Sequence, residues 1–317
     1  MYLNSLHKLS RLLILGLLFV ALVACNKPDS EVVDIVAEEP GSSTEQPTIK
    51  LAMSAAFVSE AGIDTYKSVT DYLSEKTGLK FEFVTGFSYS TINTMIGNGD
   101  MDFGFVCGLP YVLDRDLPTP RVRLVVAPVM KLDIYNNRPK YFSYLIVHKD
   151  SAIKTFADTK GVHYVYNDEF SNSGYNMPRA KLIEMKETGG FFGRVSRSGS
   201  HEESIRMVAT GEADASAVDS LVLDYDLAKN PVYAEQVKVI EMLGPAGIPP
   251  LVASSKTKPE YFEAVRKVLV EMSDDPVGRA ILDSALVDRF EVVDDENYDD
   301  IRRMKRLAEE SGFMEIR

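Results

Sequence analysis

The sequence predicts an α/β fold built from two lobes that are joined by two crossovers. Short apolar segments alternate with segments of helical spacing from residue 49 onward, and this alternation restarts near Phe142. The folded stretch of about 270 residues is also long for one open sheet. Strict alternation of strands and helices predicts mainly parallel sheets with helices on both faces.

The first lobe is predicted to begin with a strand at 49–53. Tyr66, Val69 and Leu73 then recur at helical spacing, and the helix that they indicate ends at Gly78. The elements that follow are a strand at 81–84, a helix at 90–98, a strand at 103–106, a short helix from 108 and a strand at 124–127.

The second lobe is predicted to begin with a strand at 141–148 and to repeat the same alternation. Its further strands lie at 162–166, 194–196, 213–218 and 237–242, and its helices lie at about 176–187 and 205–211. The late apolar segment 251–253 has no sheet of its own, so we expect it to return to the first lobe. The remaining tail is predicted to be helical from residue 259.

These elements divide the chain into a first lobe at 49–140 and 244–317 and a second lobe at 141–243. The two crossovers, at 139–144 and 243–249, then form a hinge. Because ligands of open α/β sheets bind at the carboxyl ends of the strands, the cleft between the lobes is the expected binding site.

The first 24 residues have the anatomy of a secretory signal, in which Lys8 and Arg11 precede a short apolar run. The run ends at Leu22-Val23-Ala24-Cys25, which resembles a bacterial lipobox whose Cys25 is lipidated and becomes the first mature residue. The alternative is a signal-anchor helix with an incidental cysteine, for which the run is short. Residues 25–48 are rich in Pro and acidic residues, which predicts a flexible tether to the membrane.

The charge balance excludes general nucleic-acid binding. Lys and Arg total 35 against 47 Asp and Glu, and without the two basic residues of 1–24 the balance is 33 − 47 = −14. Such a surface repels phosphate backbones, so any anion has to be bound by local dipoles. With Cys25 lipidated, Cys107 has no disulfide partner. We interpret it as a buried inert thiol, the alternative being a nucleophile.

Motifs for nucleotide binding and for catalysis are absent from the sequence, and its four His residues do not form a metal cluster. Ser171, His201 and an acid leave a nucleophilic triad open, although spacing alone is weak support for one. We therefore predict a binding protein without cofactor or metal, not an enzyme.

The segment Ser171-Asn172-Ser173-Gly174-Tyr175 lies between a strand and a helix and can hold an oxyanion. Its side chains offer donors, and the free N–H groups of the helix start point into the turn. The alternative is a plain N-cap. His201 also precedes a helix and can donate to an anion or simply cap the helix at the surface. Asp219 ends a strand, where it can accept from a ligand or cap the next helix.

Several segments resemble the phosphate/phosphite/phosphonate (PhnD-like) solute-binding proteins of ABC transporters. The resemblance covers 49–315 and rests on short motifs in the same order: Asp102-Phe103-Gly104-Phe105, the strand 141–147 followed by Lys149-Asp150-Ser151, the turn 171–175 with Pro178, Gly199-Ser200-His201, Gly211-Glu212-Ala213-Asp214-Ala215 with Ala217-Val218-Asp219, and Asp275-Pro276-Val277-Gly278-Arg279.

This resemblance implies a type II periplasmic-binding fold that closes on its ligand. It implies that Ser171 and Ser173 belong to the oxyanion cradle and that His201 is a ligand histidine. Tyr89 and Tyr141 fall where the family has tyrosines that reach the oxyanion from the first lobe, and Asp219 lies close to an acid of aminophosphonate-binding members. Two departures are Asn172, where a hydroxyl residue is usual, and Pro250-Leu251, where some amine-binding members have an acid.

The sequence therefore predicts a monomeric, lipid-anchored binding protein on the periplasmic face of a bacterial membrane. It would capture a small phosphonate-, phosphate- or phosphite-like oxyanion by lobe closure and pass it to an ABC permease of the inner membrane. Two alternatives stay open: the same fold with another small anion or organic solute, and a sensory or scaffolding lipoprotein that signals to a membrane partner.

Overall fold

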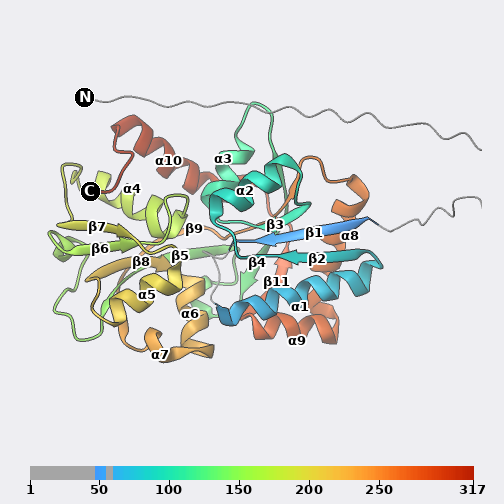
Figure 1. Cartoon of the computed structure of the whole chain (residues 1–317), viewed down its shortest axis with the longest axis horizontal. Coiled ribbons are helices and arrows are strands. Elements are labelled where there is room, and N and C mark those ends of the chain that lie inside the picture. Colours follow the sequence, from blue (N-terminus) through green and yellow to red (C-terminus); the bar gives the residue numbers. More distant parts are fainter. Residues whose placement is uncertain (1–46, 55–59) are drawn as a thin grey trace, which may run out of the picture. The chain divides into compact units, whose positions relative to one another are not determined.

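Two mixed β-sheets organise the computed structural model, which describes residues 47–54 and 60–317. The predicted signal at 1–24, the lipidated Cys25 and the tether up to residue 46 lie outside the described residues. Within the described part, one sheet has six strands and the other has five, and helices lie on both faces of each sheet (Figure 1). The predicted two-lobed α/β fold is confirmed.

The first sheet has the strand order β11-β4-β10-β3-β1-β2. Its strands are β1 Thr48–Met53, β2 Lys80–Val84, β3 Phe103–Phe105, β4 Val122–Met130, β10 Leu251–Ser254 and β11 Val287–Glu291. The segment 251–253 returns to this sheet as predicted and pairs with both β3 and β4. Strand β11 was not predicted, because the tail was interpreted as helical throughout.

The second sheet has the strand order β7-β6-β8-β5-β9. Its strands are β5 Lys140–His148, β6 His163–Tyr166, β7 Arg194–Arg197, β8 Ala215–Asp219 and β9 Val237–Gly247. All five correspond to predicted strands. The ends of four of them differ from the prediction by at most a few residues, whereas β9 extends further, to residue 247.

The prediction of mainly parallel sheets is wrong. Strands β1, β2 and β3 pair in parallel, but β10 and β11 pair antiparallel to their neighbours in the first sheet. In the second sheet β6 is parallel to β7 and β8, whereas β5 is antiparallel to β8 and β9. Parallel neighbours need a helical crossover between them, but β5 and β10 arrive from the other lobe without one and can pair in either direction, while β11 pairs with the distant β4.

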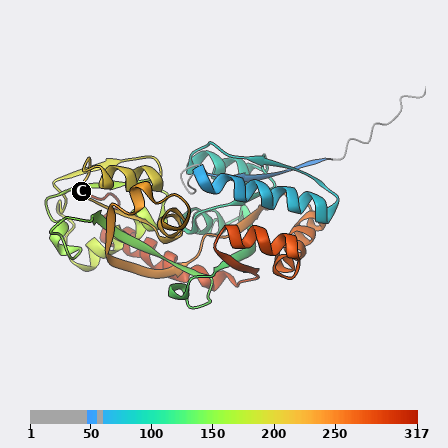
Figure 2. The ribbon, with the colours of Figure 1, turned by 90° about the horizontal axis from the view of Figure 1, so that it is seen from below.

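The two crossovers between the sheets run side by side. The start of β5 pairs with the end of β9, with Lys140 opposite Gly247 and Tyr141 opposite Ala246, so the chain enters and leaves the second lobe through neighbouring strands (Figure 2). This arrangement is the two-crossover hinge that the sequence predicted.

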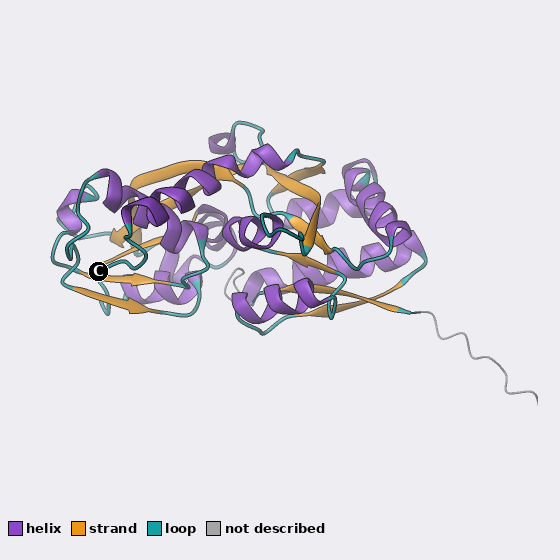
Figure 3. Ribbon diagram, turned by 90° about the horizontal axis from the view of Figure 1, so that it is seen from above, coloured by secondary structure: helices purple, strands orange, loops and turns teal. Residues whose placement is uncertain are grey.

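The helices cover the sheets on both sides (Figure 3). Around the first sheet they are α1 Glu60–Thr77, α2 Tyr89–Asn98, α3 Gly108–Arg115, α8 Pro259–Val270 and α9 Pro276–Ser284. Around the second sheet they are α4 Met177–Glu184, α5 His201–Ala209, α6 Ser220–Lys229 and the short α7 Pro231–Ala234. Single turns lie at η1 Asp133–Tyr135, η2 Ala157–Thr159, η3 Asn172–Asn176, η4 Met272–Asp274 and η5 Asp295–Tyr298.

The C-terminal helix α10 Asp299–Ser311 contacts α3 of the first lobe and α4 of the second. The residues beyond it, 312–317, bond to the second lobe: the backbone N–H groups of Phe191 and Phe192 donate to the Arg317 carbonyl, and the Arg179 guanidinium donates to the Met314 carbonyl. The boundary that assigns 244–317 to the first lobe stays a prediction, but α10 and the tail connect the two lobes a third time.

Buried apolar side chains form one large core cluster that includes Leu51 and Phe103 of the first sheet and Leu145 of the second. A smaller cluster lies between the second sheet and α5, around Val165 and Ile205. Along the residues that the structure describes, none of the helices combines the length and the hydrophobicity that crossing a membrane requires.

Candidate functional site

The serine-rich turn lies between β6 and α4 and is completely buried. Ser171 Oγ accepts a hydrogen bond from the Gly174 N–H at 3.0 Å, which makes Ser171 the N-cap of η3. Pro178 falls in the first turn of α4, as the sequence predicted. The capping alternative therefore holds for Ser171, but Ser171 and Ser173 are both 0% exposed. Capping therefore does not explain the whole turn, because Ser173 is buried there as well and is not the cap.

His201 brings a second helix start to this turn. Ser200 caps α5 by accepting from the Glu203 N–H, so His201 is the first residue of the helix. Its side chain is buried, and its Nε2 lies 3.4 Å from the Oγ atoms of both Ser171 and Ser173. The alternative of a surface capping histidine does not fit this burial.

The protonation of His201 follows from its neighbours. The backbone N–H of Asp219 donates to His201 Nδ1 at 3.3 Å, so Nδ1 is the unprotonated nitrogen and Nε2 carries the hydrogen. Burial lowers the pKa of His201 to about 3, so the ring is neutral near pH 7. His201 therefore presents one neutral N–H donor to the two serines.

Asp219 ends β8 and caps α6 with one of its two carboxyl oxygens. Its Oδ1 accepts from the Leu221 N–H at 2.8 Å, whereas its Oδ2 is buried and has no hydrogen-bond partner in the described part of the chain. Burial raises the pKa of Asp219 to about 8, against the lowering effect of the Leu221 N–H. Near pH 7 the side chain is therefore mostly a neutral carboxylic acid.

The first lobe contributes Tyr89, the first residue of α2, which begins after its N-cap Ser88. The Tyr89 hydroxyl is buried and has no hydrogen-bond partner among the described residues. Burial raises the pKa of Tyr89, and the nearby Cys107 and Asp219 raise it further, so the hydroxyl stays protonated. Cys107 is itself in contact with the second lobe, through the Asn172 N–H.

Tyr141 reaches the same region, but from the second sheet and not from the first lobe as the resemblance implied. It lies on β5, and its buried hydroxyl accepts a hydrogen bond from Asn172 Nδ2 at 3.0 Å. The two lobes also meet directly at the turn, where the Asn172 N–H donates to Cys107 Sγ at 3.3 Å. Burial raises the pKa of Cys107 to about 11, so this contact involves a neutral thiol, consistent with an inert role.

Six of the predicted residues therefore come together between the lobes, and we call them the oxyanion cluster: Tyr89, Tyr141, Ser171, Ser173, His201 and Asp219.

Three other predicted residues support this cluster from outside it. The side-chain amide of Asn172 donates through Nδ2 to the Tyr141 hydroxyl and accepts through Oδ1 from Asn176 Nδ2. Gly174 lies so close to Asn167 that an added Cβ would be 2.0 Å from Asn167 Oδ1, so only glycine fits. The Tyr175 hydroxyl bonds to Met314 and Ile316 of the tail and so faces away from the cluster.

Asn167 was missed by the sequence analysis. It follows β6 directly, is completely buried, and its Nδ2 lies 3.1 Å from His201 Nε2, while its Oδ1 has no partner in the described part of the chain. Its place after a strand whose carboxyl end faces the cleft was the available signal, since polar residues at such ends bind ligands in open α/β sheets.

The two arginines next to the cluster use their printed hydrogen bonds on groups outside it. Arg197 pairs with Asp168, and Arg179 donates to Asn176 and to the tail. A search of the described residues finds no group of three or more His, Cys, Asp or Glu side chains that could hold a metal. The cluster is thus a buried set of neutral donors, which suits an anion and not a cation.

Comparison with known proteins gives the family. Residues 51–298 match the family model described as "ABC transporter, phosphonate, periplasmic substrate-binding protein". A curated relative, the probable ABC transporter phosphite-binding protein PhnD1 of Prochlorococcus marinus, is 27% identical over 169 residues, which are 50% of this chain and 54% of the relative. The match thus spans about half of the length of that relative.

Two solved structures share the fold. A binding protein component of an ABC phosphonate transporter from Pseudomonas aeruginosa has a TM-score of 0.75 at 20% identity, covering 84% of this chain and 88% of that one. PhnD1 from Prochlorococcus marinus in complex with methylphosphonate has a TM-score of 0.71 at 19% identity, covering 82% and 97%.

These relatives are binding proteins of transporters, so the prediction of a binding protein and not an enzyme is confirmed. Because the family model matches well over half of the chain, the protein belongs to the family of periplasmic substrate-binding proteins of phosphonate ABC transporters.

Proposed function

We propose that this protein captures a small phosphonate-, phosphate- or phosphite-like oxyanion in the oxyanion cluster and passes it to an ABC permease. The observation that carries the proposal is the burial of neutral donors from both lobes around three polar atoms that have no partner among the described residues, Tyr89 Oη, Asn167 Oδ1 and Asp219 Oδ2. A buried polar group without a partner costs about 1–3 kcal/mol, so such groups are retained where a ligand pairs with them.

The donors match the oxygens of a tetrahedral anion. Tyr89, Ser171, Ser173 and His201 each offer one O–H or N–H, and the protonated Asp219 offers another. The starts of α2 and α5 add the positive ends of their helix dipoles. Neutral donors bind an anion tightly when water is excluded, which is how a protein of charge −12 can hold an anion.

Asn167 completes the donor set in this proposal. Because His201 Nε2 carries its hydrogen, a bond to the Asn167 amide requires the amide oxygen to face His201. The NH₂ group then takes the position beside Gly174 and Ser171, next to the other donors. Lobe opening admits the anion, because the residues of the cluster are closed off from solvent and bonded to one another.

Calorimetry of the purified soluble protein with phosphate, phosphite and methylphosphonate tests the proposal. We expect saturable binding of at least one of the three, accompanied by a higher melting temperature, because a ligand of the folded state stabilises it. Acetate and chloride serve as control anions. If none of the three phosphorus oxyanions binds better than acetate, the proposed function is wrong.

We propose further that the protein is a lipoprotein anchored through Cys25, as the lipobox-like segment suggests. The Cys25→Ser variant, expressed in a Gram-negative host, is expected to lose membrane association because one or two acyl chains are what hold the protein there. Partitioning in Triton X-114 measures this. The wild-type protein should enter the detergent phase, whereas detergent partitioning of Cys25→Ser would contradict lipidation at this residue.

A further inference from the structure

A buried arginine lies behind the serine-rich turn and has no acid partner. Arg179, on α4, is only 7% exposed, and it forms no ion pair with a carboxylate in the described part of the chain. Its guanidinium donates instead to the Met314 carbonyl at 3.0 Å and to Asn176 Oδ1 at 2.8 Å. Burial lowers the pKa of Arg179, although a guanidinium stays protonated in proteins. Because burying a charge without a counter-charge is costly, stability alone does not explain this cation.

Arg179 begins a chain of hydrogen bonds that ends in the oxyanion cluster. Its next bond runs from Asn176 Nδ2 to Asn172 Oδ1 at 2.9 Å, and its last bond runs from Asn172 Nδ2 to the Tyr141 hydroxyl at 3.0 Å. Asn172 and Asn176 are four residues apart and Arg179 follows three residues later, a spacing that holds the three side chains on one helical face. We call Arg179, Asn176 and Asn172 the amide relay.

The direction of every bond in the amide relay follows from the arginine. A guanidinium has donors only, so the atom of Asn176 that faces Arg179 has to be the amide oxygen, and the NH₂ group faces Asn172. Asn172 then accepts through its oxygen and turns its own NH₂ group to Tyr141. The Tyr141 oxygen thus receives one hydrogen and has its own hydrogen left to donate inside the cluster, where Ser173 is a neighbour. An amide without a fixed partner has no such direction, because its two ends are similar in shape.

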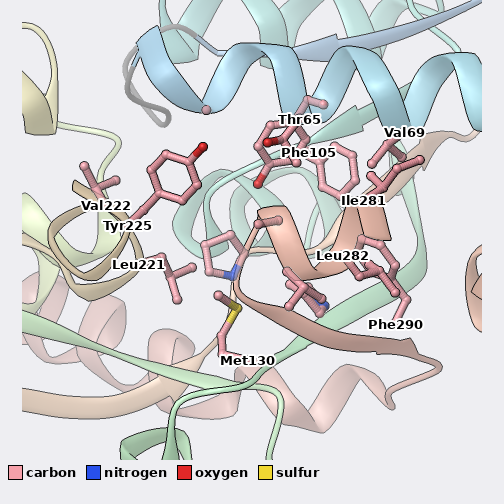
Figure 4. A pocket seen from close by; sticks show the side chains of 16 residues that line it. Thr65, Val69, Phe105, Met130, Leu221, Val222, Tyr225, Ile281, Leu282 and Phe290 are labelled. Atoms are coloured by element: carbon pink, nitrogen blue, oxygen red, sulfur yellow. The ribbon is translucent and has the colours of Figure 1, made fainter. Parts of the chain in front are cut away.

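The cleft side of the cluster offers no comparable cation. Helix α6 lines a pocket in which Leu221 and Tyr225 face Phe105, and none of the residues described as its lining carries a charge (Figure 4). Arg197, the other arginine next to the cluster, is paired with an acid. Of these two arginines, Arg179 is therefore the one that hydrogen bonds connect to the cluster.

We propose that Arg179, Asn176 and Asn172 are positioning residues, which fix the Tyr141 hydroxyl as a hydrogen-bond donor to the bound oxyanion. This inference rests on the proposed function, because Tyr141 belongs to the same cluster. The charged oxygens of an oxyanion accept hydrogen bonds, so a hydroxyl that presented a lone pair to them would repel them. Fixing the direction in advance removes the molecules in which Tyr141 points the wrong way, and the buried charge polarises each bond toward the anion.

The Asn176→Asp variant is expected to reverse the relay. Aspartate still accepts from Arg179, and the new ion pair should keep the protein folded, but a carboxylate cannot donate to Asn172. The Asn172 amide then turns its NH₂ group to the aspartate and its oxygen to Tyr141, which has to donate its hydrogen there and not to the ligand. In calorimetry with methylphosphonate, or with inorganic phosphate or phosphite if one of these binds the wild type more tightly, the Kd should rise about 10- to 150-fold.

A double-mutant cycle with Tyr141→Phe separates the relay from other effects. Phenylalanine has no hydroxyl, so Asn176→Asp should weaken binding at least about tenfold less in this background than in the wild type. Any effect of the added carboxylate on the anion is common to both backgrounds and cancels in the comparison. Thermal unfolding of all four proteins checks that they are folded. An equal loss of affinity in the two backgrounds would overturn the proposal, because a merely structural role of Asn176 does not depend on the hydroxyl.

If Asn176→Asp does not fold, Arg179→Met replaces it in the same cycle. Without the guanidinium the relay can run in either direction, so about half of the molecules should point Tyr141 the wrong way. The Kd should then rise about twofold or more, and only where the hydroxyl of Tyr141 is present. A loss that is absent, or that is the same in the Tyr141→Phe background, contradicts the role of Arg179.

The outcomes separate the two proposals. If the wild-type protein binds one of the three oxyanions but the cycle shows no coupling to Tyr141, the relay is wrong and the proposed function stands. If the wild-type protein binds none of them, both proposals are overturned together.

Discussion

Replacing Ser173 by alanine is expected to weaken oxyanion binding by about 1–3 kcal/mol, which raises Kd about 5- to 150-fold. Ser173 Oγ is fully buried and lies 3.4 Å from His201 Nε2, so its loss removes one donor from the oxyanion cluster without exposing a new group to water. The fold should not suffer, because the backbone carbonyl of Ser173, which accepts from Ser143 Oγ at 2.7 Å, is retained.

A matched pair of variants distinguishes binding from folding. Ser171→Ala removes a similar hydroxyl but also the N-cap of η3, so it should weaken binding and cost about 1 kcal/mol of stability. Ser173→Ala should leave the melting temperature nearly unchanged, as should Ser255→Ala at an exposed serine after β10, which should also keep full affinity. Calorimetry and thermal unfolding measure both quantities. A Ser173→Ala protein with wild-type affinity would remove this serine from the proposed site.

Local pattern was enough to predict most elements of the fold. Apolar periodicity and helix stop signals depend on nearby residues only. Gly99 is such a stop signal, since it takes a left-handed conformation at φ 80° directly after α2. Strand direction depends on distant partners, and this is where prediction failed. β10 lies antiparallel between β3 and β4, and β11 adds to β4 from the far end of the chain. Nothing in their short sequences specifies those neighbours.

The oxyanion cluster was predictable where a residue ends a strand or begins a helix. Ser171, His201 and Asp219 all occupy such positions, and the structure places them together. The direction of individual side chains was not predictable. Ser173 and Tyr175 are two residues apart in the turn η3, and residues at that spacing point to different sides of a helical turn, so only one of them can face the cluster.

Asp219 is expected to make oxyanion affinity depend on pH. Burial raises its pKa to about 8, so below that pH the carboxyl group carries a proton that it can donate to the anion. Above pH 8 the group ionises, and binding an anion beside it then requires uptake of a proton. The affinity should therefore fall as pH rises, by close to tenfold per unit, which amounts to about 30-fold between pH 7 and pH 9.5.

The Asp219→Asn variant isolates this effect. Asparagine keeps an oxygen that can cap α6 at the Leu221 N–H and an NH₂ donor for the ligand, but it does not titrate. Because the ligand's own ionisation acts on both proteins equally, the ratio of the variant's affinity to that of the wild type should rise about 30-fold from pH 7 to pH 9.5. Calorimetry across this range measures the ratio, and a ratio that stays constant would show that binding does not use the Asp219 proton.

The stability of the ligand-free protein should also depend on the ionisation of Asp219. The carboxyl of Asp219 has an ordinary pKa of 3.8 and a raised pKa of about 8 in the folded chain, so between these values the folded state binds more protons than the unfolded state. Stability should therefore decline as pH rises from 4 to 8, and Asp219→Asn should remove that part of the decline. Burial of Asp219 therefore lowers the stability of the ligand-free fold as the pH approaches neutrality. A ligand that binds the folded protein with Asp219 protonated stabilises that fold, which explains why a buried acid is retained at this position.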